Sequence, residues 1–223
     1  MRPATVSELV YAERPAAGEP SGLLVLHHGR GADEHDLLPL ADMLDPQRRL
    51  HVVTPRAPLQ LPGWPGNHWY VVPRVGFPEP ESFHASYTLL AELHDELWQR
   101  TGLGPQRTVL GGFSMGSVMS YGLSLAADRP APAGILAMSG FIPTVEGWRA
   151  SFDDRTQLGA FIAHGCEDPV IDVQFGRAAH QQLLDAGLPV EYHEFAGGHH
   201  VDPALLPAAR DWLGARLALH DVG

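Results

Sequence analysis

The strongest constraint on the fold is an alternation of short apolar runs with longer segments of helical period. The apolar runs are rich in valine, leucine and isoleucine, as in strands buried inside a sheet. Six of them occur, at residues 22–27, 50–54, 107–111, 134–138, 160–163 and 189–195. Strands separated by helices predict an α/β fold with a mainly parallel sheet and helices on both faces.

The segments between the runs indicate helices. Within residues 83–97 the apolar side chains fall on one side of a helix and the acidic ones largely on the other, as in a helix packed on a sheet. A further helix is predicted to begin near Asp172 and to end at Gly187, which provides a stop signal. Asp202, followed by proline, predicts the start of the last helix.

Residues 55–80 do not fit this alternation. They are rich in proline, glycine and aromatic residues and have no sustained period, so they predict a long surface loop. Loops of this length inside compact domains are commonly functional, and we expect Trp64, His68, Trp69 and Tyr70 to line a substrate pocket. The alternative is that these aromatic residues anchor the loop on the domain surface.

Length and charge limit the class of protein. A chain of 223 residues with 44% apolar residues can bury a large core, and we expect a single domain over residues 1–223. The formal net charge is −11, and the 15 basic residues are all arginine and are spread along the chain. Because no basic patch is formed, we expect neither nucleic acid nor anionic membrane as a partner.

The sequence shows no targeting signal. Residues 1–20 contain no basic run followed by an apolar stretch, and no segment approaches the roughly 18 apolar residues that span a bilayer. Cys166 is the one cysteine, so an internal disulfide is impossible, which is typical of a reducing compartment. We therefore expect a cytoplasmic protein without stable membrane insertion.

The sharpest chemical signal is the G-x-S-x-G pattern of Gly112-Phe-Ser114-Met-Gly116. It comes directly after a predicted strand and before a predicted helix, which is the context of a nucleophile elbow. Such an elbow needs glycines on both sides, because the serine backbone is strained and larger neighbours would collide with the strand and helix. The alternative is a glycine-rich turn with an incidental serine. The context favours Ser114 as a nucleophile.

A serine nucleophile needs an acid and a base, which follow it in the chain in the order serine, acid, histidine. Asp168 lies in a loop after a predicted strand, so we predict it as the acid. Glu167 and Asp172 are the rivals, interpreted as a solvated charge and a helix cap. The base is predicted at His199 after a glycine pair, although spacing alone does not separate it from His200.

The first strand runs into His27-His-Gly29-Arg30-Gly31, a glycine-rich turn. Turns of this kind after an early strand supply backbone N–H groups to an oxyanion hole. We predict that the amides of Arg30 and Met115 bind the developing oxyanion. Taken alone, the turn could equally be an ordinary glycine turn.

Histidines and carboxylates crowd one short stretch, which raises the question of a metal site. His193, Glu194, His199, His200 and Asp202 lie close together in sequence, but their spacing matches no established zinc motif. We expect no metal, and the predicted chemistry needs no cofactor.

Together the motifs resemble the phospholipase/carboxylesterase family of α/β-hydrolases, which includes the acyl-protein thioesterases. The resemblance covers nearly the whole chain. It rests on His28-Gly-Arg-Gly31, Pro55-Arg-Ala-Pro58, Gly112-Phe-Ser-Met-Gly116, Ser139-Gly140, His164-Gly-Cys-Glu-Asp168 and Gly197-Gly-His199. It implies an α/β-hydrolase fold and the catalytic triad Ser114, Asp168 and His199, and it supports Arg30 and Met115 as oxyanion donors. Homodimers occur in this family.

Two departures from the thioesterase branch bear on the substrate. That branch commonly has glutamine after the serine and an apolar residue between the first-loop glycines, where this chain has Met115 and Arg30. The chain is more similar to the small bacterial esterases of the family. The short stretch from Gly140 to Ala160 leaves no room for a large cap domain, and an open pocket suits small esters.

We therefore predict a serine carboxylesterase that hydrolyses short- to medium-chain carboxylic esters through an acyl-enzyme on Ser114. An acyl thioesterase or lysophospholipase with the same triad is the alternative. A non-catalytic small-molecule sensor that kept the fold is a third hypothesis, because fold alone does not determine function.

Overall fold

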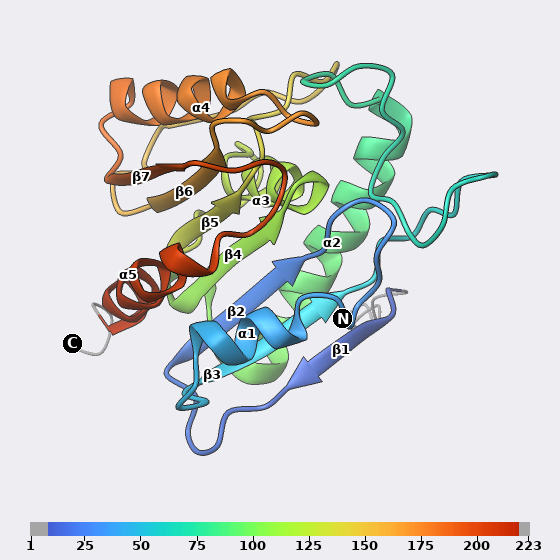
Figure 1. Cartoon of the computed structure of the whole chain (residues 1–223). Helices are drawn as coiled ribbons and strands as arrows, with labels where there is room; N and C mark the ends of the chain where they lie inside the picture. Colours follow the sequence, from blue (N-terminus) through green and yellow to red (C-terminus); the bar gives the residue numbers. More distant parts are fainter. Residues whose placement is uncertain (1–8, 219–223) are drawn as a thin grey trace.

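The computed structural model describes residues 9–218 and shows an open, twisted sheet between two layers of helices (Figure 1). The strands of this region are β1 (Tyr11–Arg14), β2 (Gly22–His27), β3 (Leu50–Pro55), β4 (Thr108–Phe113), β5 (Gly134–Met138), β6 (Gly159–Gly165) and β7 (Val190–Phe195). Their order in the sheet is β1-β3-β2-β4-β5-β6-β7. Only β1 is antiparallel to its neighbour, so the predicted mainly parallel sheet is confirmed.

Helices cover both faces of the sheet, as predicted. The α-helices are α1 (Leu38–Leu44), α2 (Pro80–Thr101), α3 (Met115–Ser124), α4 (Val173–Asp185) and α5 (Leu206–Ala218). Short 3₁₀ turns lie at η1 (Pro105–Arg107) and η2 (Pro203–Leu205). Because side chains alternate along a strand, β2 sends Leu23 toward α2 and α3 and Leu24 toward α1 and α5. Every residue of β2 is buried, which explains its uninterrupted apolar sequence.

The pattern missed two short elements at one side of the sheet. β1 has the sequence Tyr-Ala-Glu-Arg and pairs only with β3, so it is an edge strand without an apolar run. Helix α1 is short, and too few turns are present for a periodic signal. The last helix begins later than expected, because a 3₁₀ turn at Pro203–Leu205 precedes α5.

The predicted long loop is present between β3 and α2, where residues 56–79 contain no helix or extended strand. Isolated bridges pair Ala32 with Asn67 and Leu59 with His68, so the loop folds back and is fastened to the turn after β2. Figure 1 shows it at the end of the sheet toward which β2 and β4 point. The loop is therefore placed beside the carboxyl ends of the parallel strands.

The strand order creates a switch point between β2 and β4. From β2 the chain goes to β3 on one side, and it later returns to β4 on the other side. Crevices at such points, outside the carboxyl ends of the strands, are where ligands bind in open α/β sheets. None of the helices within residues 9–218 is long and apolar enough to cross a bilayer. The expected domain over residues 1–223 also includes 1–8 and 219–223, which lie outside the described residues.

Candidate active site

Ser114 stands at the sharp turn between β4 and α3, beside the switch point. Its backbone has φ 56°, a left-handed value that is costly for a residue with a side chain. The flanking glycines make the turn possible. A Cβ on Gly112 would lie 2.6 Å from the carbonyl oxygen of His27, and one on Gly116 would overlap that same carbonyl group. The motif is therefore required by the packing of the elbow against the end of β2.

Buried hydrogen bonds hold this elbow in place. The amide of Ser114 donates to the carbonyl of Met138 at 2.8 Å. The Ser117 hydroxyl donates to the carbonyl of Gly112 at 2.6 Å and accepts from the amide of Met138 at 2.9 Å. These bonds tie the turn to the end of β5, and they offset the strain at Ser114.

The structure brings Ser114, His199 and Asp168 together in one hydrogen-bonded chain. His199 Nε2 lies 2.8 Å from Ser114 Oγ, and His199 Nδ1 lies 2.7 Å from Asp168 Oδ2. The three residues come from the turn after β4 and from the loops after β6 and β7. Ser114 and Asp168 are 7% and 8% exposed, so the chain is largely screened from solvent while the serine stays accessible. This is the geometry in which a histidine can take the serine proton.

The loop after β6 is built to keep Asp168 ionised. Asp168 Oδ1 accepts from the amides of Val170 at 2.8 Å and Ile171 at 2.9 Å. Burial opposes ionisation, but the hydrogen bonds from His199 and from these two amides outweigh it and hold the pKa of Asp168 below its usual value. His164 Nε2 lies 2.8 Å from the carbonyl of Ile171 and fastens the loop to β6. A carboxylate held in this way fixes the tautomer and orientation of His199.

The rival residues lie elsewhere. Glu167 is exposed, and Asp172 caps α4 by accepting from the amide of Gln174 at 2.8 Å. His200 packs edge-on against Phe195, with ring centroids 5.1 Å apart, and forms no hydrogen bond with Ser114. The structure therefore joins His199, and not His200, to the serine.

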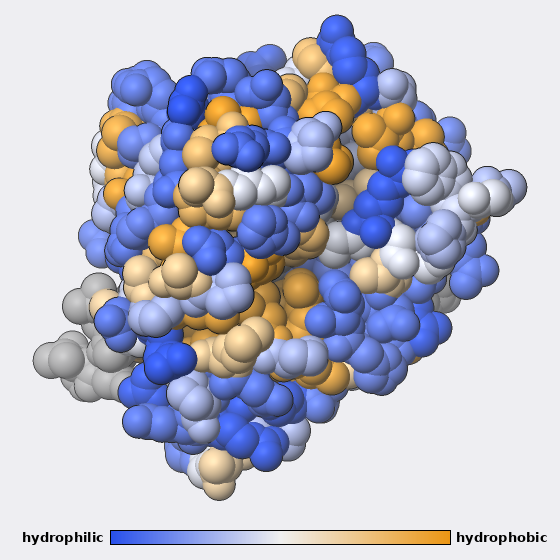
Figure 2. Space-filling view, viewed as in Figure 1, coloured by the Kyte–Doolittle hydropathy of each residue, from blue (hydrophilic) through white to orange (hydrophobic). Residues whose placement is uncertain are grey.

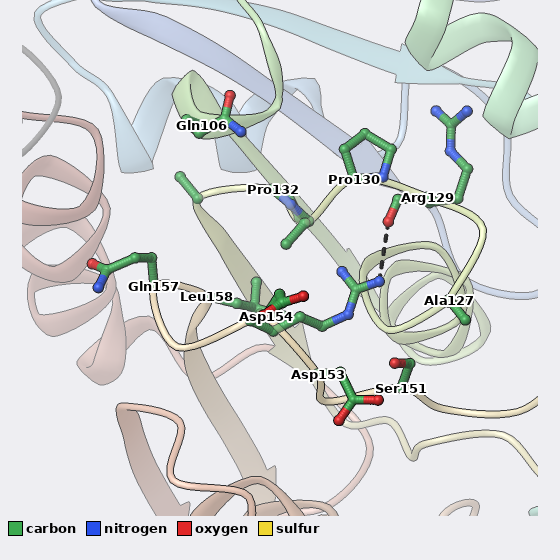
Figure 3. Close-up of a pocket in the computed structure, with 13 residues that line it drawn as sticks. Gln106, Ala127, Arg129, Pro130, Pro132, Ser151, Asp153, Asp154, Gln157 and Leu158 are labelled. Atoms are coloured by element: carbon green, nitrogen blue, oxygen red, sulfur yellow. Dashed lines mark hydrogen bonds between the residues drawn. The ribbon is translucent and has the colours of Figure 1, made fainter.

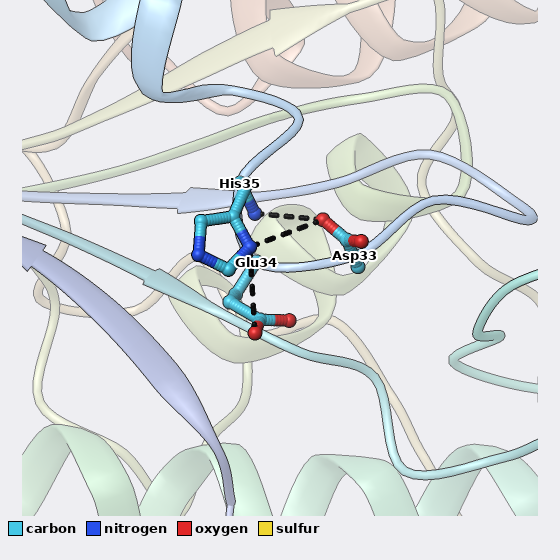
Figure 4. Close-up of side chains that lie close together, drawn as sticks. All are labelled: Asp33, Glu34 and His35. Carbon is cyan, nitrogen blue, oxygen red and sulfur yellow. Dashed lines mark hydrogen bonds and ion pairs between the residues drawn. The ribbon is translucent and has the colours of Figure 1, made fainter.

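His193 and Glu194, two of the residues that raised the question of a metal site, each bind a different partner. His193 Nε2 lies 2.8 Å from Glu191, and Arg177 binds both oxygens of Glu194 at 2.7 Å. A different group, Asp33, Glu34 and His35, brings possible ligand atoms within 4.8 Å of one another (Figure 4). There both oxygens of Glu34 accept from Arg56 at 2.5 Å, and this ion pair lowers the pKa of the Glu34 carboxyl.

The turn after β2 lies across from the elbow, as the oxyanion prediction requires. Arg30 and Met115 both line the cavity that contains Ser114 and His199. Met115 is the first residue of α3, where backbone N–H groups have no partner within the helix. The side chain of His28 ties this turn to the segment after β3, because its Nε2 accepts from the amide of Ala57 at 3.0 Å.

The cavity in front of Ser114 has a volume of about 350 Å³ and mostly apolar walls. In the space-filling view, apolar side chains reach the surface in a hollow near the middle of the face, among hydrophilic ones (Figure 2). The lining residues are Gly29, Arg30, Ala32, Asp36, Tyr70, Val72, Val75, Phe113, Ser114, Met115, Phe141, Val170, Ile171 and His199. Such walls suit the acyl chain or the alcohol group of a small ester.

Only one of the four aromatic residues predicted to line the pocket does so. Tyr70 lines the cavity, whereas Trp69 and His68 are fully buried and do not line it. The Trp69 indole donates to the carbonyl of His28 at 2.9 Å, so this residue anchors the loop. Trp64 is 55% exposed and stacks on Arg30 outside the lining. For these three residues the structure corrects the prediction, because Trp69 anchors the loop, His68 is buried and Trp64 stacks on Arg30 outside the lining.

Sequence reasoning missed most of the apolar lining. Phe141 follows the Ser139-Gly140 motif directly, and Val170 and Ile171 come two and three residues after Asp168. Their position shortly after a motif at the carboxyl end of a strand was the signal that could have identified them as lining residues. Asp36 gave no signal, because it lies in a turn with other charged residues.

A larger cavity of about 650 Å³ lies at the opposite end of the sheet, around the residues that precede β5 and β6 (Figure 3). Its buried Arg155 donates to the carbonyl groups of Ser124 at 2.9 Å and of Arg129 at 3.0 Å. Arg155 therefore ties the end of α3 to the following loop. None of the predicted site residues lines this cavity.

Comparisons with known proteins identify the family of this chain. A family model described as phospholipase/carboxylesterase matches residues 13–216. Acyl-protein thioesterase 1 of Neurospora crassa is 26% identical over 223 residues, covering 91% of this chain and 90% of that protein. Lysophospholipase-like protein 1 of Mus musculus is 26% identical over 183 residues, covering 76% of this chain and 74% of that protein.

Two solved structures show the same fold over almost their whole length. The Bacillus cereus carboxylesterase has a TM-score of 0.82 at 22% identity and covers 94% of this chain and 95% of that one. Esterase PE8 has a TM-score of 0.77 at 28% identity and covers 93% of this chain and 98% of that one. With these matches, the predicted α/β-hydrolase fold is confirmed.

Proposed function

The chain belongs to the phospholipase/carboxylesterase family, and from this premise we propose that it is a serine carboxylesterase acting on short- to medium-chain esters. The observation that carries the proposal is the hydrogen-bonded chain from Ser114 through His199 to Asp168 at the edge of a cavity. Fold similarity alone would support only a hydrolase of this family.

In the proposed acylation step, Ser114 Oγ attacks the carbonyl carbon of the ester while His199 Nε2 takes the hydroxyl proton. Asp168 holds the other ring nitrogen and stabilises the imidazolium that forms. The negative charge on the carbonyl oxygen is bound by the amides of Arg30 and Met115, an interaction worth about 3 kcal/mol per donor in comparable sites. The carbon–oxygen bond to the alcohol then breaks, and His199 returns the proton to the leaving oxygen.

In the proposed deacylation step, water takes the place of the alcohol. His199 removes a proton from this water, which attacks the acyl-enzyme and forms a second tetrahedral intermediate. Breakdown of this intermediate releases the carboxylic acid and restores the Ser114 hydroxyl. Every group transferred comes from the substrate, the water or the triad, so the scheme uses no cofactor.

The size of the cavity supports small esters. A volume of about 350 Å³ lies at the lower end of the range for small-molecule sites. Val72, Val75 and Phe141 supply apolar contact for an acyl chain. The segment that joins β5 to β6 contains no inserted domain that could cover the cavity, so short substrates can enter and leave directly.

Thioester hydrolysis is the second candidate function. It is favoured by the curated relatives, several of which are named acyl-protein thioesterases. The same nucleophile, base and oxyanion donors would serve both reactions, because only the leaving atom differs. Lysophospholipid hydrolysis belongs to the same alternative, through the relative named lysophospholipase-like protein 1.

The first experiment measures kcat/KM for p-nitrophenyl esters from acetate to palmitate, with the native protein and Ser114→Ala in parallel. Ser151→Ala is the matched control, because Ser151 lines the cavity at the opposite end of the sheet. We expect Ser114-dependent turnover with a maximum at short or medium chains. A maximum at palmitate would favour the lipase or thioesterase hypothesis over the carboxylesterase proposal. The absence of turnover would favour the hypothesis of a non-catalytic sensor.

A matched pair of butyrate oxygen ester and butyrate thioester separates the two enzyme candidates. The carboxylesterase proposal predicts the higher kcat/KM on the oxygen ester after correction for the uncatalysed rate of each compound. A serine-directed phosphonate provides a readout independent of substrate choice. Mass spectrometry should find its adduct on Ser114, and an adduct on another residue would contradict the proposed mechanism.

We also place this activity in the cytoplasm. Cys166 has no second cysteine in the chain to pair with, as is typical of a reducing compartment. Fractionation of the native host tests the location, and activity in an extracellular fraction of intact cells would contradict it.

A further inference from the structure

Arg30 has a side chain whose charge the proposed mechanism does not use. The proposed mechanism uses only its backbone amide, yet Arg30 lines the cavity in front of Ser114, and its positive charge acts on Tyr70 in the same lining. Within residues 9–218, no carboxylate forms an ion pair with it, and its guanidinium carbon lies 3.7 Å from the ring centroid of Trp64. The cavity is therefore bordered by a cation with no protein counter-ion.

The position of this cation is fixed by two loops that meet through glycines. The amide of Gly31 donates to the carbonyl of Asn67 at 2.9 Å, and the amide of Asn67 donates to the carbonyl of Ala32 at 3.0 Å. Gly66 has φ 65° and lies so close to Gly31 that a Cβ there would overlap the Gly31 carbonyl group. This contact brings the tip of the long loop, with Trp64, over the residue next to Gly31.

Stacking on Trp64 orients Arg30 without consuming its hydrogen bonds. A guanidinium stacks through its flat face, and its N–H donors point outward in the plane. Those donors stay available to a planar oxyanion, which Arg binds with two parallel hydrogen bonds.

Tyr70 offers a second donor in the same cavity. Tyr70 is 2% exposed, and no described residue forms a hydrogen bond with its hydroxyl. Burial raises the pKa of this phenol far above its usual value, and the nearby charge of Arg30 offsets only part of the rise. Tyr70 therefore adds to the lining a neutral phenol whose hydroxyl has no partner among the described residues.

From these contacts we infer that the preferred substrate is an ester carrying a separate carboxylate, such as a monoester of a dicarboxylic acid, and that Arg30 binds this carboxylate. The inference rests on the proposed function and names the substrate class of the same site. The remaining lining residues are mainly apolar and would contact the carbon chain between the two groups.

A single negative charge fits the cavity better than a double one. Among the described residues that line the cavity, Arg30 is the one arginine, whereas the carboxylate of Asp36 is also in the lining and would repel an anion. A phosphate monoester would carry about two charges at neutral pH against this one cation. A carboxylate matches the fork of Arg30 in both shape and charge.

Two pairs of substrates test the inference, each with a charged and a neutral member of the same shape. The first pair, the p-nitrophenyl monoesters of glutaric acid and of glutaramic acid, places the charge on the acyl side. The second pair, the butyrate esters of 4-hydroxybenzoate and 4-hydroxybenzamide, places it on the alcohol side. The readout is the kcat/KM ratio of the charged to the neutral ester, so changes common to both esters cancel.

We expect a ratio of at least about ten in one pair, which Arg30→Gln should lower about tenfold because it removes a charge-assisted bidentate contact. Arg30→Lys, which keeps the charge but not the fork, should give an intermediate ratio. Asp36→Asn should raise the ratio. Arg74→Gln is the matched control, because Arg74 stacks on Phe77 at 3.8 Å and does not line the cavity.

The outcomes separate this inference from the proposed function. If none of the four esters is hydrolysed in a Ser114-dependent way, the proposed function itself fails. If both members of each pair are hydrolysed but Arg30→Gln leaves both ratios unchanged, the function stands and the anion site is overturned. A lysophospholipid carries a phosphodiester in place of the carboxylate. If it is turned over faster than the glutarate monoester, and Arg30→Gln removes this advantage, the preferred anion is a phosphodiester and the proposed substrate class is overturned.

Discussion

The floor and the mouth of the cavity are held by different kinds of interaction. At the floor, the elbow around Ser114 is fixed by buried hydrogen bonds and by glycine contacts that leave no space for another atom. At the mouth, Arg30 is held by its stack on Trp64, a residue that is 55% exposed. The floor carries the proposed chemistry, and the mouth carries the proposed choice of substrate.

Because the interactions differ, a substitution at the floor and one at the mouth should cost different amounts of free energy. Buried contacts without free space cost several kcal/mol when they are disturbed, whereas an exposed stack contributes about 0.5–1 kcal/mol. Changes at the floor should therefore affect all esters alike. Changes at the mouth should alter the ratio between esters and leave the fold intact.

The largest effect is expected for Asp168→Asn. An amide would lose control of the His199 tautomer, and kcat should fall about 10⁴-fold on charged and neutral esters alike. Steady-state kinetics on both members of a substrate pair measures this, and circular dichroism checks that the fold is kept. Normal activity in this variant would move the acid to another residue and break the assignment of the floor.

Gly116→Ala should cause the next largest effect. The added Cβ overlaps the carbonyl group of His27, so the free energy of unfolding should fall by about 3 kcal/mol or more. Urea unfolding measures the change. Gly18→Ala is the matched control, because a Cβ at that position has no heavy atom within 4 Å apart from its chain neighbours. Equal stability of the two variants would show that the elbow is not the rigid part of the molecule.

The pH dependence of folding tests the layer beneath the floor, where His94 is buried beside His27 with ring centroids 5.6 Å apart. Burial, with a smaller contribution from Arg129, lowers the pKa of His94 to about 3. An unfolded histidine has a pKa of about 6.5, so between these values the unfolded chain binds more protons. Stability should therefore be full above pH 6.5 and fall as the pH drops below it.

His94→Leu should remove part of this acid sensitivity. The histidine accounts for a loss of about 2 kcal/mol between pH 7 and pH 5, so the variant should lose less stability over that interval. Urea unfolding of both proteins at the two pH values gives the difference, whatever the stability of the variant at pH 7. Parallel pH dependence of the two proteins would contradict the buried neutral state of His94.

The smallest effect is expected for Trp64→Leu at the mouth. Loss of the stack should lower the ratio of charged to neutral ester turnover about threefold, because Arg30 keeps its charge but loses its orientation. Phe77→Leu removes a similar arginine stack outside the cavity lining and serves as control. If the ratio of charged to neutral ester turnover is the same in Trp64→Leu and in the control, stacking on Trp64 does not orient Arg30 for binding.

Much of the sheet could be predicted because its central strands are buried on both faces. All six residues of β2 are buried, and such a strand gives an uninterrupted apolar run. β1 could not be found in this way, because it is a short edge strand with one neighbour and polar residues. Edge position is a property of the assembled sheet and leaves no local pattern.

For the candidate site, the sequence could point to residues that have a fixed place in the chain order. Ser114, Asp168 and His199 each follow a strand, and parallel strands bring their carboxyl ends to one edge of the sheet. The pocket prediction failed for Trp64, His68 and Trp69, because composition cannot tell an aromatic residue that anchors a loop from one that faces a cavity. That distinction depends on contacts between distant segments, such as those of Trp69 with His28 and of Gly66 with Gly31.

By itself, the sequence determined the sheet class, the elbow and the order of the three predicted catalytic residues, because these depend on local period and on motifs next to strands. Only the tertiary structure decided that His199 rather than His200 meets Ser114, and that Arg30 borders the same cavity with Trp64 behind it. Those choices depend on how loops from different strands pack against one another. Packing between distant segments is a three-dimensional property, and no local stretch of sequence records it.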